Sequence, residues 1–197
     1  MTLVDQQACA DVIQAWGFAR DQGRWSELSA TFAPDGEIAV SWFRGPFQDF
    51  VERCRQSFAA GVRSKHLIWP PLVRVNGERA VAETSIAILV RQSIDGVPVD
   101  LTSQGRFLDR LERRGRWMIV ERAAIYERDR LDPVQPSPAF KALMQNAEVE
   151  KFPEGYRYMA FRVLAAGRTL AEPVHCDGTG ETDALYARYA AWLGDKQ

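Results

Sequence analysis

Histidine and cysteine are both scarce in this chain of 197 residues. The two histidines, His66 and His175, lie far apart and show no metal-ligand spacing. The cysteines, Cys9, Cys54 and Cys176, are odd in number and form no C-x-x-C pair. A disulfide framework and a bound metal are therefore not expected, and the free thiols favour a reducing compartment.

Long hydrophobic runs and an excess of charge of one sign are also lacking. No apolar run reaches the roughly 18 residues that a membrane-spanning helix needs. The opening stretch "MTLVDQQACADVIQAW" carries acids rather than a basic start, which is not typical of a signal peptide. A net charge of −1 gives no global attraction to nucleic acid or anionic lipid, and "RFLDRLERRGR" is better interpreted as a solvated hairpin tip. We therefore expect a cytoplasmic protein without nucleic-acid or membrane partners.

Nucleotide-binding and nucleophile motifs are missing as well. The sequence contains no G-x-S-x-G, no G-x-G-x-x-G and no phosphate-binding loop. "CDGTGE" has the glycines but lacks the Lys-Ser/Thr that would follow them in such a loop. These absences predict chemistry that needs no cofactor.

The first third of the chain has the periodicity of helices around one strand. Residues 4–20 place Cys9, Ile13, Trp16 and Arg20 at helical spacing, and Gly23 ends that segment. A short helix follows over 25–32, and "EIAVSWF" at 37–43 alternates as a strand does. Gly45-Pro46 begins a third helix, which ends at Gly61.

The middle of the chain has the period of β-strands. Four strands are predicted over 66–75, 80–92, 97–112 and 117–128, joined by turn signals at 76–78, 95–96 and 113–116. Tight turns make the sheet largely antiparallel, and long antiparallel strands twist. The prediction is an α+β fold: a curved sheet packed on three N-terminal helices as a cone-shaped barrel over 1–132.

Residues 133–197 form a predicted C-terminal extension. The proline-rich "DPVQPSP" separates it from the barrel, and helical pieces are expected over 138–147, 153–166 and 181–193. The extension is too small for a core of its own, so it should pack on the barrel, on a neighbouring subunit or over the mouth of the cavity.

The order of elements resembles the SnoaL-like branch of the nuclear-transport-factor-2-like superfamily. The residues that carry the resemblance are "FARDQGRWSELSATFAPDGEI", "HLIWPPLVRVNGERAVAET" and "GRFLDRLERRGRWMIVERAAIYERD". Scytalone dehydratase, hexachlorocyclohexane dehydrochlorinase and bile-acid dehydratase of this branch use an aspartate at the end of the first helix and a histidine at the start of the second strand. The resemblance implies that Asp21 and His66 form such a pair, and that the chain is a homodimer or homotrimer. The tail looks like that of a longer subgroup that includes a cofactor-free diarylpropane lyase.

The residues themselves also support Asp21 and His66 as a catalytic pair. Imidazole has an unperturbed pKa of about 6.5, so it can take and return a proton near neutral pH. A carboxylate behind it fixes the tautomer and stabilises the imidazolium. The alternative is structural: a histidine at a strand start can simply hydrogen-bond, and an aspartate in "RDQG" can simply form a turn.

An apolar cavity with a few polar groups is the expected binding site. On the last strand, Arg122 and Tyr126 share one face with Met118, Val120 and Ala124, and we expect that face to point inward and hold an oxyanion or phenolate. The expected substrate-binding residues are Trp16, Phe18, Trp25, Trp42, Trp69, Gln104, Arg122 and Tyr126.

These observations predict a cofactor-independent lyase or isomerase that acts on a small hydrophobic, aromatic substrate. Elimination of water, halide or an aldehyde fragment by His66 and Asp21 is the favoured reaction. Two alternatives stay open: a noncatalytic binding or scaffold module of the same fold, and a polyketide cyclase.

Overall fold

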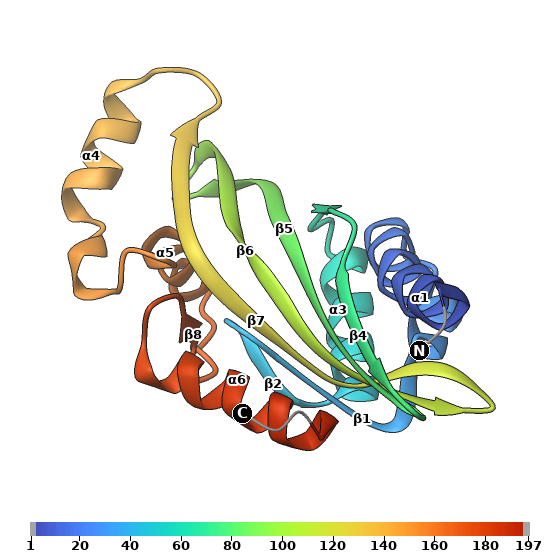
Figure 1. Cartoon of the computed structure of the whole chain (residues 1–197). Helices are drawn as coiled ribbons and strands as arrows, with labels where there is room; N and C mark the ends of the chain where they lie inside the picture. Colours follow the sequence, from blue (N-terminus) through green and yellow to red (C-terminus); the bar gives the residue numbers. More distant parts are fainter. Residues whose placement is uncertain (1–2, 195–197) are drawn as a thin grey trace.

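A computed structural model describes residues 3–194. Eight strands form one curved sheet in the order β2-β1-β7-β6-β5-β3, with β4 also pairing with β5 and β8 with β7 (Figure 1). The strands are β1 (Phe32–Val40), β2 (Phe43–Pro46), β3 (Ser64–Ile68), β4 (Leu72–Asn76), β5 (Arg79–Ile94), β6 (Val97–Arg114), β7 (Arg116–Pro133) and β8 (His175–Cys176). Among the strands of residues 3–194, β1–β7 and β7–β8 pair in parallel and the other pairs are antiparallel. The predicted α+β fold with a mostly antiparallel sheet is confirmed.

Three N-terminal helices pack on the concave face of this sheet. They are α1 (Leu3–Gln22), α2 (Trp25–Ala30) and α3 (Phe47–Ala59). In α1 the buried residues include Cys9, Ile13 and Trp16, spaced so that one face of the helix meets the sheet. In α3 the buried stripe is Phe47, Phe50, Val51 and Cys54, and the helix starts directly after Pro46. Their aromatic rings and the inward side chains of β5, β6 and β7 form the main core.

Two of the predicted strands differ from the structure. The segment 66–75 is not one strand: Pro70 and Pro71 separate β3 from β4, because proline has no N–H to give to the sheet. The segment 37–43 is likewise divided, since β1 ends at Val40 and a tight turn leads into β2. The β5–β6 hairpin has the expected Asp95-Gly96 turn, with φ of 49° and 79°.

β7 contains two bulges that change which side chains point inward. Opposite β6, Val120 and Glu127 are the extra residues, since Arg110 pairs with Glu121 but Leu111 pairs with Ile119, and Gln104 pairs with Arg128 but Gly105 with Tyr126. The predicted face of Arg122 and Tyr126 does point inward. Met118 and Val120 do not share it, however, because Trp117 and Ile119 occupy the core before the first bulge.

The C-terminal extension packs on the sheet of its own chain. Its helices are α4 (Pro138–Asn146), α5 (Arg157–Ala165) and α6 (Gly180–Leu193), with a 3-10 turn at Val149–Lys151. Leu185, Tyr189 and Leu193 of α6 lie against Val81, Leu108, Ala123 and Ile125 on the convex face. α5 lies on the opposite face of the sheet, where Met159, Ala160 and Val163 join the main core, and it is close to the C-terminal end of α4 (Figure 1).

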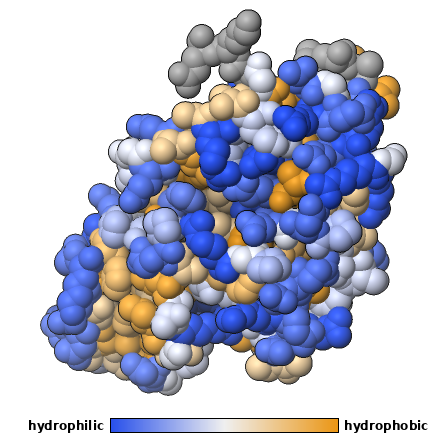
Figure 2. Space-filling model, turned by 90° about the horizontal axis from the view of Figure 1, so that it is seen from below, coloured by the Kyte–Doolittle hydropathy of each residue, from blue (hydrophilic) through white to orange (hydrophobic). Residues whose placement is uncertain are grey.

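Hydrophilic residues cover most of the surface seen from the α6 side, and hydrophobic residues gather in one patch there (Figure 2). Within residues 3–194, no helix combines the length and the hydropathy that crossing a membrane would require.

At Gly105, β6 approaches the backbone of β7 closely. A Cβ at this position would lie 2.2 Å from the carbonyl oxygen of Ile125, which is backbone and cannot move aside. We expect Gly105→Ala to lower the free energy of unfolding by about 1–3 kcal/mol through overpacking. Urea unfolding measures this change. Gly180→Ala is the matched control, because a Cβ there meets nothing within 4 Å, and an equal loss in both variants would contradict the close approach.

Candidate functional site

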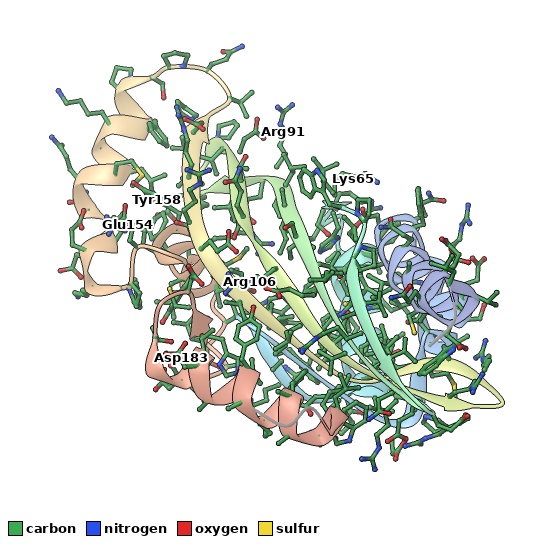
Figure 3. All side chains as sticks on the ribbon, in the orientation of Figure 1. Lys65, Arg91, Arg106, Glu154, Tyr158 and Asp183 are labelled. Carbon is green, nitrogen blue, oxygen red and sulfur yellow. The ribbon has the colours of Figure 1, made fainter. Side chains whose placement is uncertain are left out.

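Asp21 and His66 are in direct contact at one end of the sheet. Asp21 lies in the last turn of α1 and His66 in β3, opposite Ile88 of β5. The carboxylate Oδ1 lies 2.6 Å from His66 Nδ1, and the backbone N–H of His66 donates to Oδ2 at 2.7 Å. Lys65 Nζ lies 3.4 Å from Oδ2, and Figure 3 shows Lys65 where β3 approaches α1. Both side chains of the pair are buried, at 4% and 8% exposed.

The protonation states of this pair follow from its surroundings. Burial acts to raise the pKa of Asp21, but the hydrogen bonds and charge of His66, together with Lys65, outweigh it, so the pKa lies below its ordinary value. Burial lowers the pKa of His66 below 6.5; Asp21 opposes this shift, and the cations Arg20 and Arg122 add to it. At neutral pH the pair is thus a carboxylate and a neutral imidazole. Nδ1 donates to Asp21, and Nε2 is left with its lone pair.

A small cavity adjoins His66 between the sheet and the helices. Its volume is about 60 Å³, room for only a few water molecules. The wall combines aromatic, hydroxyl and guanidinium side chains. Its lining residues are Trp16, Arg20, Val40, Ser41, Trp42, Phe50, Ser57, Val62, Ser64, His66, Ile88, Val90, Phe107, Tyr126, Met159, Arg162 and Arg168.

A larger, open hollow of about 480 Å³ shares part of this wall. Trp42, Ser57 and Arg168 line both spaces, and Arg53 also lines the outer one, which we call the vestibule. Arg168 lies over the ring of Trp42 with 5.5 Å between the guanidinium carbon and the ring centroid. The shared residues therefore stand between the surface and the buried imidazole.

Three of the expected substrate-binding residues line the cavity. Trp16 packs edge-on against the ring of His66, with centroids 5.2 Å apart. Trp42 lies on the vestibule side, and Tyr126 accepts a hydrogen bond from the backbone N–H of Ser41 at 3.0 Å. The sequence pattern and the topology thus bring Trp16, Trp42 and Tyr126 together with His66.

Four of the expected residues lie elsewhere. Phe18 and Trp69 are 54% and 48% exposed and line, together with His66, a separate hollow of about 370 Å³ between α1 and β3. Trp25 packs on Phe58 with centroids 5.5 Å apart, away from the cavity. Gln104 lies on the convex face and accepts a hydrogen bond from Arg128; Arg106, two residues along that face, reaches Tyr186 of α6 (Figure 3). These positions correct the expectation that all four contact a substrate in one cavity, because strand alternation turns Gln104 away.

Arg122 points inward as expected but is sealed in the core. It is fully buried, and its Nε and Nη2 each donate to Asp109 at 2.7 Å. Trp16 and Phe107 stack on its guanidinium at 4.6 and 4.1 Å. Arg122 does not line the cavity, so the expectation that it holds a substrate oxyanion is wrong; the directly opposed Asp109 on β6 neutralises it instead.

Several polar cavity residues were not expected from the sequence. Ser41 Oγ and Ser64 Oγ are buried and have no hydrogen-bond partner among the described residues, and the same holds for Nε1 of Trp16, a residue that was expected. Arg20 continues the apolar stripe of α1, and a charged residue on such a stripe was the available signal. Arg162 and Arg168 come from the extension, where no motif marks them. Within the described part of the chain, no three of histidine, cysteine, aspartate and glutamate are placed to share a metal ion.

Comparison with known proteins places this chain in a family. The SnoaL-like domain matches residues 1–123, and the chain belongs to the SnoaL-like family. A PEP2-like protein of Fusarium vanettenii is 27% identical over 95% of this chain and 84% of its own length. An uncharacterized protein of Emericella nidulans is 24% identical over 99% of this chain and 88% of its own length.

Solved structures with the same fold are more distant in sequence. A protein of Novosphingobium aromaticivorans, provisionally named scytalone dehydratase, superposes with a TM-score of 0.55 at 16% identity, over 68% of this chain and 91% of its own. A protein of unknown function from Mycobacterium tuberculosis gives 0.53 at 18% identity, over 87% and 96%. These likenesses establish the fold, and the fold is one that often carries lyase or isomerase activity.

Proposed function

We propose that this protein is a cofactor-independent lyase that eliminates water, halide or an aldehyde fragment from a small aromatic substrate. The observation that carries the proposal is the buried contact of 2.6 Å between Asp21 and His66 beside a cavity. The provisional scytalone dehydratase name of a structural relative agrees with this class of reaction.

His66 is the proposed general base. Since Asp21 holds the proton on Nδ1, Nε2 can accept a proton from a substrate atom that enters the cavity. The electrons of the broken bond then form a double bond as the leaving group departs with its own pair. The carboxylate of Asp21 stabilises the imidazolium that is present in between, and the imidazolium can return its proton to the leaving group.

Tyr126 is the proposed hydrogen-bond donor to the substrate. Its oxygen already accepts the N–H of Ser41, so its own proton is free to point toward a ligand. Burial raises the pKa of Tyr126, which keeps the hydroxyl protonated. A donor held in a low-dielectric wall stabilises oxygen atoms that gain negative charge during the reaction.

The size of the cavity limits how a substrate binds. About 60 Å³ is too little for an aromatic ring, so the ring of a substrate has to bind outside the inner cavity. The vestibule, at about 480 Å³, has the size of a ligand pocket. We therefore propose that the ring occupies the vestibule beside Trp42 and that the reacting end enters the inner cavity.

The pH dependence of kcat/KM tests the role of His66. A general base must be deprotonated to accept a proton, and the pKa of His66 is lowered below 6.5. We therefore expect kcat/KM to be constant around neutral pH and to decrease as the pH is lowered, with a midpoint below pH 6.5. Because Asp21 raises the pKa of His66, Asp21→Asn should move this midpoint to still lower pH and also reduce the plateau. The measurement is the initial rate of alkene formation from aryl compounds with a leaving group next to an acidic C–H.

The two alternatives predict other results in the same experiment. A noncatalytic binding module would bind these compounds without turnover, and a cyclase would form a carbon–carbon bond instead of an alkene. A midpoint that Asp21→Asn leaves unchanged would contradict the proposed pair even where turnover is found.

A further inference from the structure

Three arginines line the cavity beside His66. Arg20 comes from α1, Arg162 from α5 and Arg168 from the segment after α5. Their contacts are with neutral groups: Arg162 donates to the side-chain oxygen of Gln92 at 2.8 Å, and Arg168 donates to Ser57 Oγ at 3.0 Å. Arg20 lies beside the buried thiol of Cys54. Elements far apart in sequence thus deliver three positive charges to one small space.

No carboxylate in the described chain neutralises these guanidinium groups. The cavity wall contains no aspartate or glutamate, and the nearby Asp21 is engaged by His66 and Lys65. None of the ion pairs found among residues 3–194 includes Arg20, Arg162 or Arg168.

Other inward or half-buried arginines of the same fold are paired. Arg122 has Asp109, and Arg106 has Glu83, Glu127 and Asp177. The fold therefore supplies a carboxylate where a buried guanidinium is part of the structure. At the cavity no carboxylate of the described residues pairs with Arg20, Arg162 or Arg168, and this difference sets the three arginines apart from the others.

The uncompensated charge is costly to the folded protein. Burial, followed by the charge of Arg168, lowers the pKa of Arg162 to about 10, and the charge of Arg20 acts in the same direction. Buried charges are normally paired, because removing an ion from water is unfavourable without a counter-charge. A cluster that carries this cost is explained by a counter-charge that arrives with a ligand.

We propose that Arg20, Arg162 and Arg168 bind a carboxylate group of the substrate, so that the substrate class is an aromatic carboxylate. The assignment rests on the proposed function, since it names the substrate of the same site. Guanidinium groups match the planar geometry of a carboxylate and can each donate two hydrogen bonds to it. The carboxylate occupies the inner cavity, and the ring lies in the vestibule.

The neighbouring groups suit this ligand. Ser41 Oγ, Ser64 Oγ and Trp16 Nε1 line the same cavity without hydrogen-bond partners among the described residues, and each can donate to a carboxylate oxygen. Arg53 in the vestibule adds a further cation along the route inward. A buried donor without a partner requires an explanation, and a carboxylate oxygen of a ligand supplies one here.

Binding of trans-cinnamate and its neutral isostere trans-cinnamamide tests the proposal. Affinities are measured by calorimetry in the His66→Ala variant, so that no turnover interferes. Cinnamate should bind at least about tenfold more tightly than cinnamamide, since a charge-assisted hydrogen bond is worth more than a neutral one. Arg162→Met and Arg168→Gln should each remove this preference, and Arg130→Gln, which changes a 78% exposed arginine, should keep it.

Thermal unfolding separates this role from a structural one. If Arg162 serves a ligand, Arg162→Met should leave the Tm unchanged or raise it, because an unpaired buried charge is removed. Equal affinity for cinnamate and cinnamamide, or a preference that survives both cavity variants, would overturn the proposal. So would inorganic phosphate that displaces cinnamate at a lower concentration than acetate does, because the site would then select a phosphate.

The proposed function and this inference fail separately. If cinnamate binding depends on the arginines but turnover does not depend on His66, the carboxylate site stands and the proposed role of His66 as general base is wrong. If the pH profile changes with Asp21 and His66 as expected but cinnamate binds no more tightly than cinnamamide, the general base stands and the carboxylate site is wrong.

Discussion

His66→Ala is expected to lower kcat/KM by about 100- to 10,000-fold, the usual contribution of a positioned general base. The imidazole holds its proton on Nδ1 against Asp21 and has Nε2 free, and alanine offers no group that can accept a substrate proton. The measurement is the initial rate of alkene formation with an aryl substrate that the unchanged protein converts. The loss should lie in kcat, because the base acts on the transition state rather than on substrate binding.

The other histidine of the chain is the matched control. His175 lies in β8, paired with Ile125, and does not line the cavity. His175→Ala should therefore keep turnover close to that of the unchanged protein. Circular dichroism and the Tm of both variants show whether the fold is retained. Full activity of a folded His66→Ala protein would remove the proposed mechanism.

Asp109→Asn is expected to cost about 3–5 kcal/mol in the free energy of unfolding, as for other buried ion pairs that lose one partner. Asp109 and Arg122 are both fully buried and joined by two hydrogen bonds of 2.7 Å. Asparagine leaves the guanidinium charge in the core between the rings of Trp16 and Phe107 without a counter-charge. Urea unfolding, followed by tryptophan fluorescence, measures the change.

A double variant distinguishes the loss of the ion pair from a loss of packing as the cause of the destabilisation. Replacing both partners, as in Asp109→Leu with Arg122→Met, removes both charges and should recover much of the stability that Asp109→Asn loses. Asp100→Asn, in an exposed pair with Arg91, should change stability little. If the double variant were less stable than Asp109→Asn, the cost would come from packing rather than from the uncompensated charge.

Local sequence patterns determined most of the fold. Helical periodicity located α1 and α3, and alternation with Gly-containing turns located the long strands β5, β6 and β7. The splitting of residues 66–75 was readable in principle, because Pro70-Pro71 stands in the sequence. The bulges at Val120 and Glu127 were not readable, since an extra residue is defined only by the register of the partner strand.

The resemblance to SnoaL-like enzymes singled out Asp21 and His66, and the chemistry of the two side chains agreed with it. Their separation of 2.6 Å, the sealing of Arg122 by Asp109, and the outward position of Gln104 were decided by the tertiary structure. The same holds for the arginine cluster, which joins Arg20 of α1 to Arg162 and Arg168 of the extension. Periodicity reports which face of one element is apolar, whereas a site is made by side chains from several elements. Their meeting depends on sheet register and packing, which no local pattern encodes.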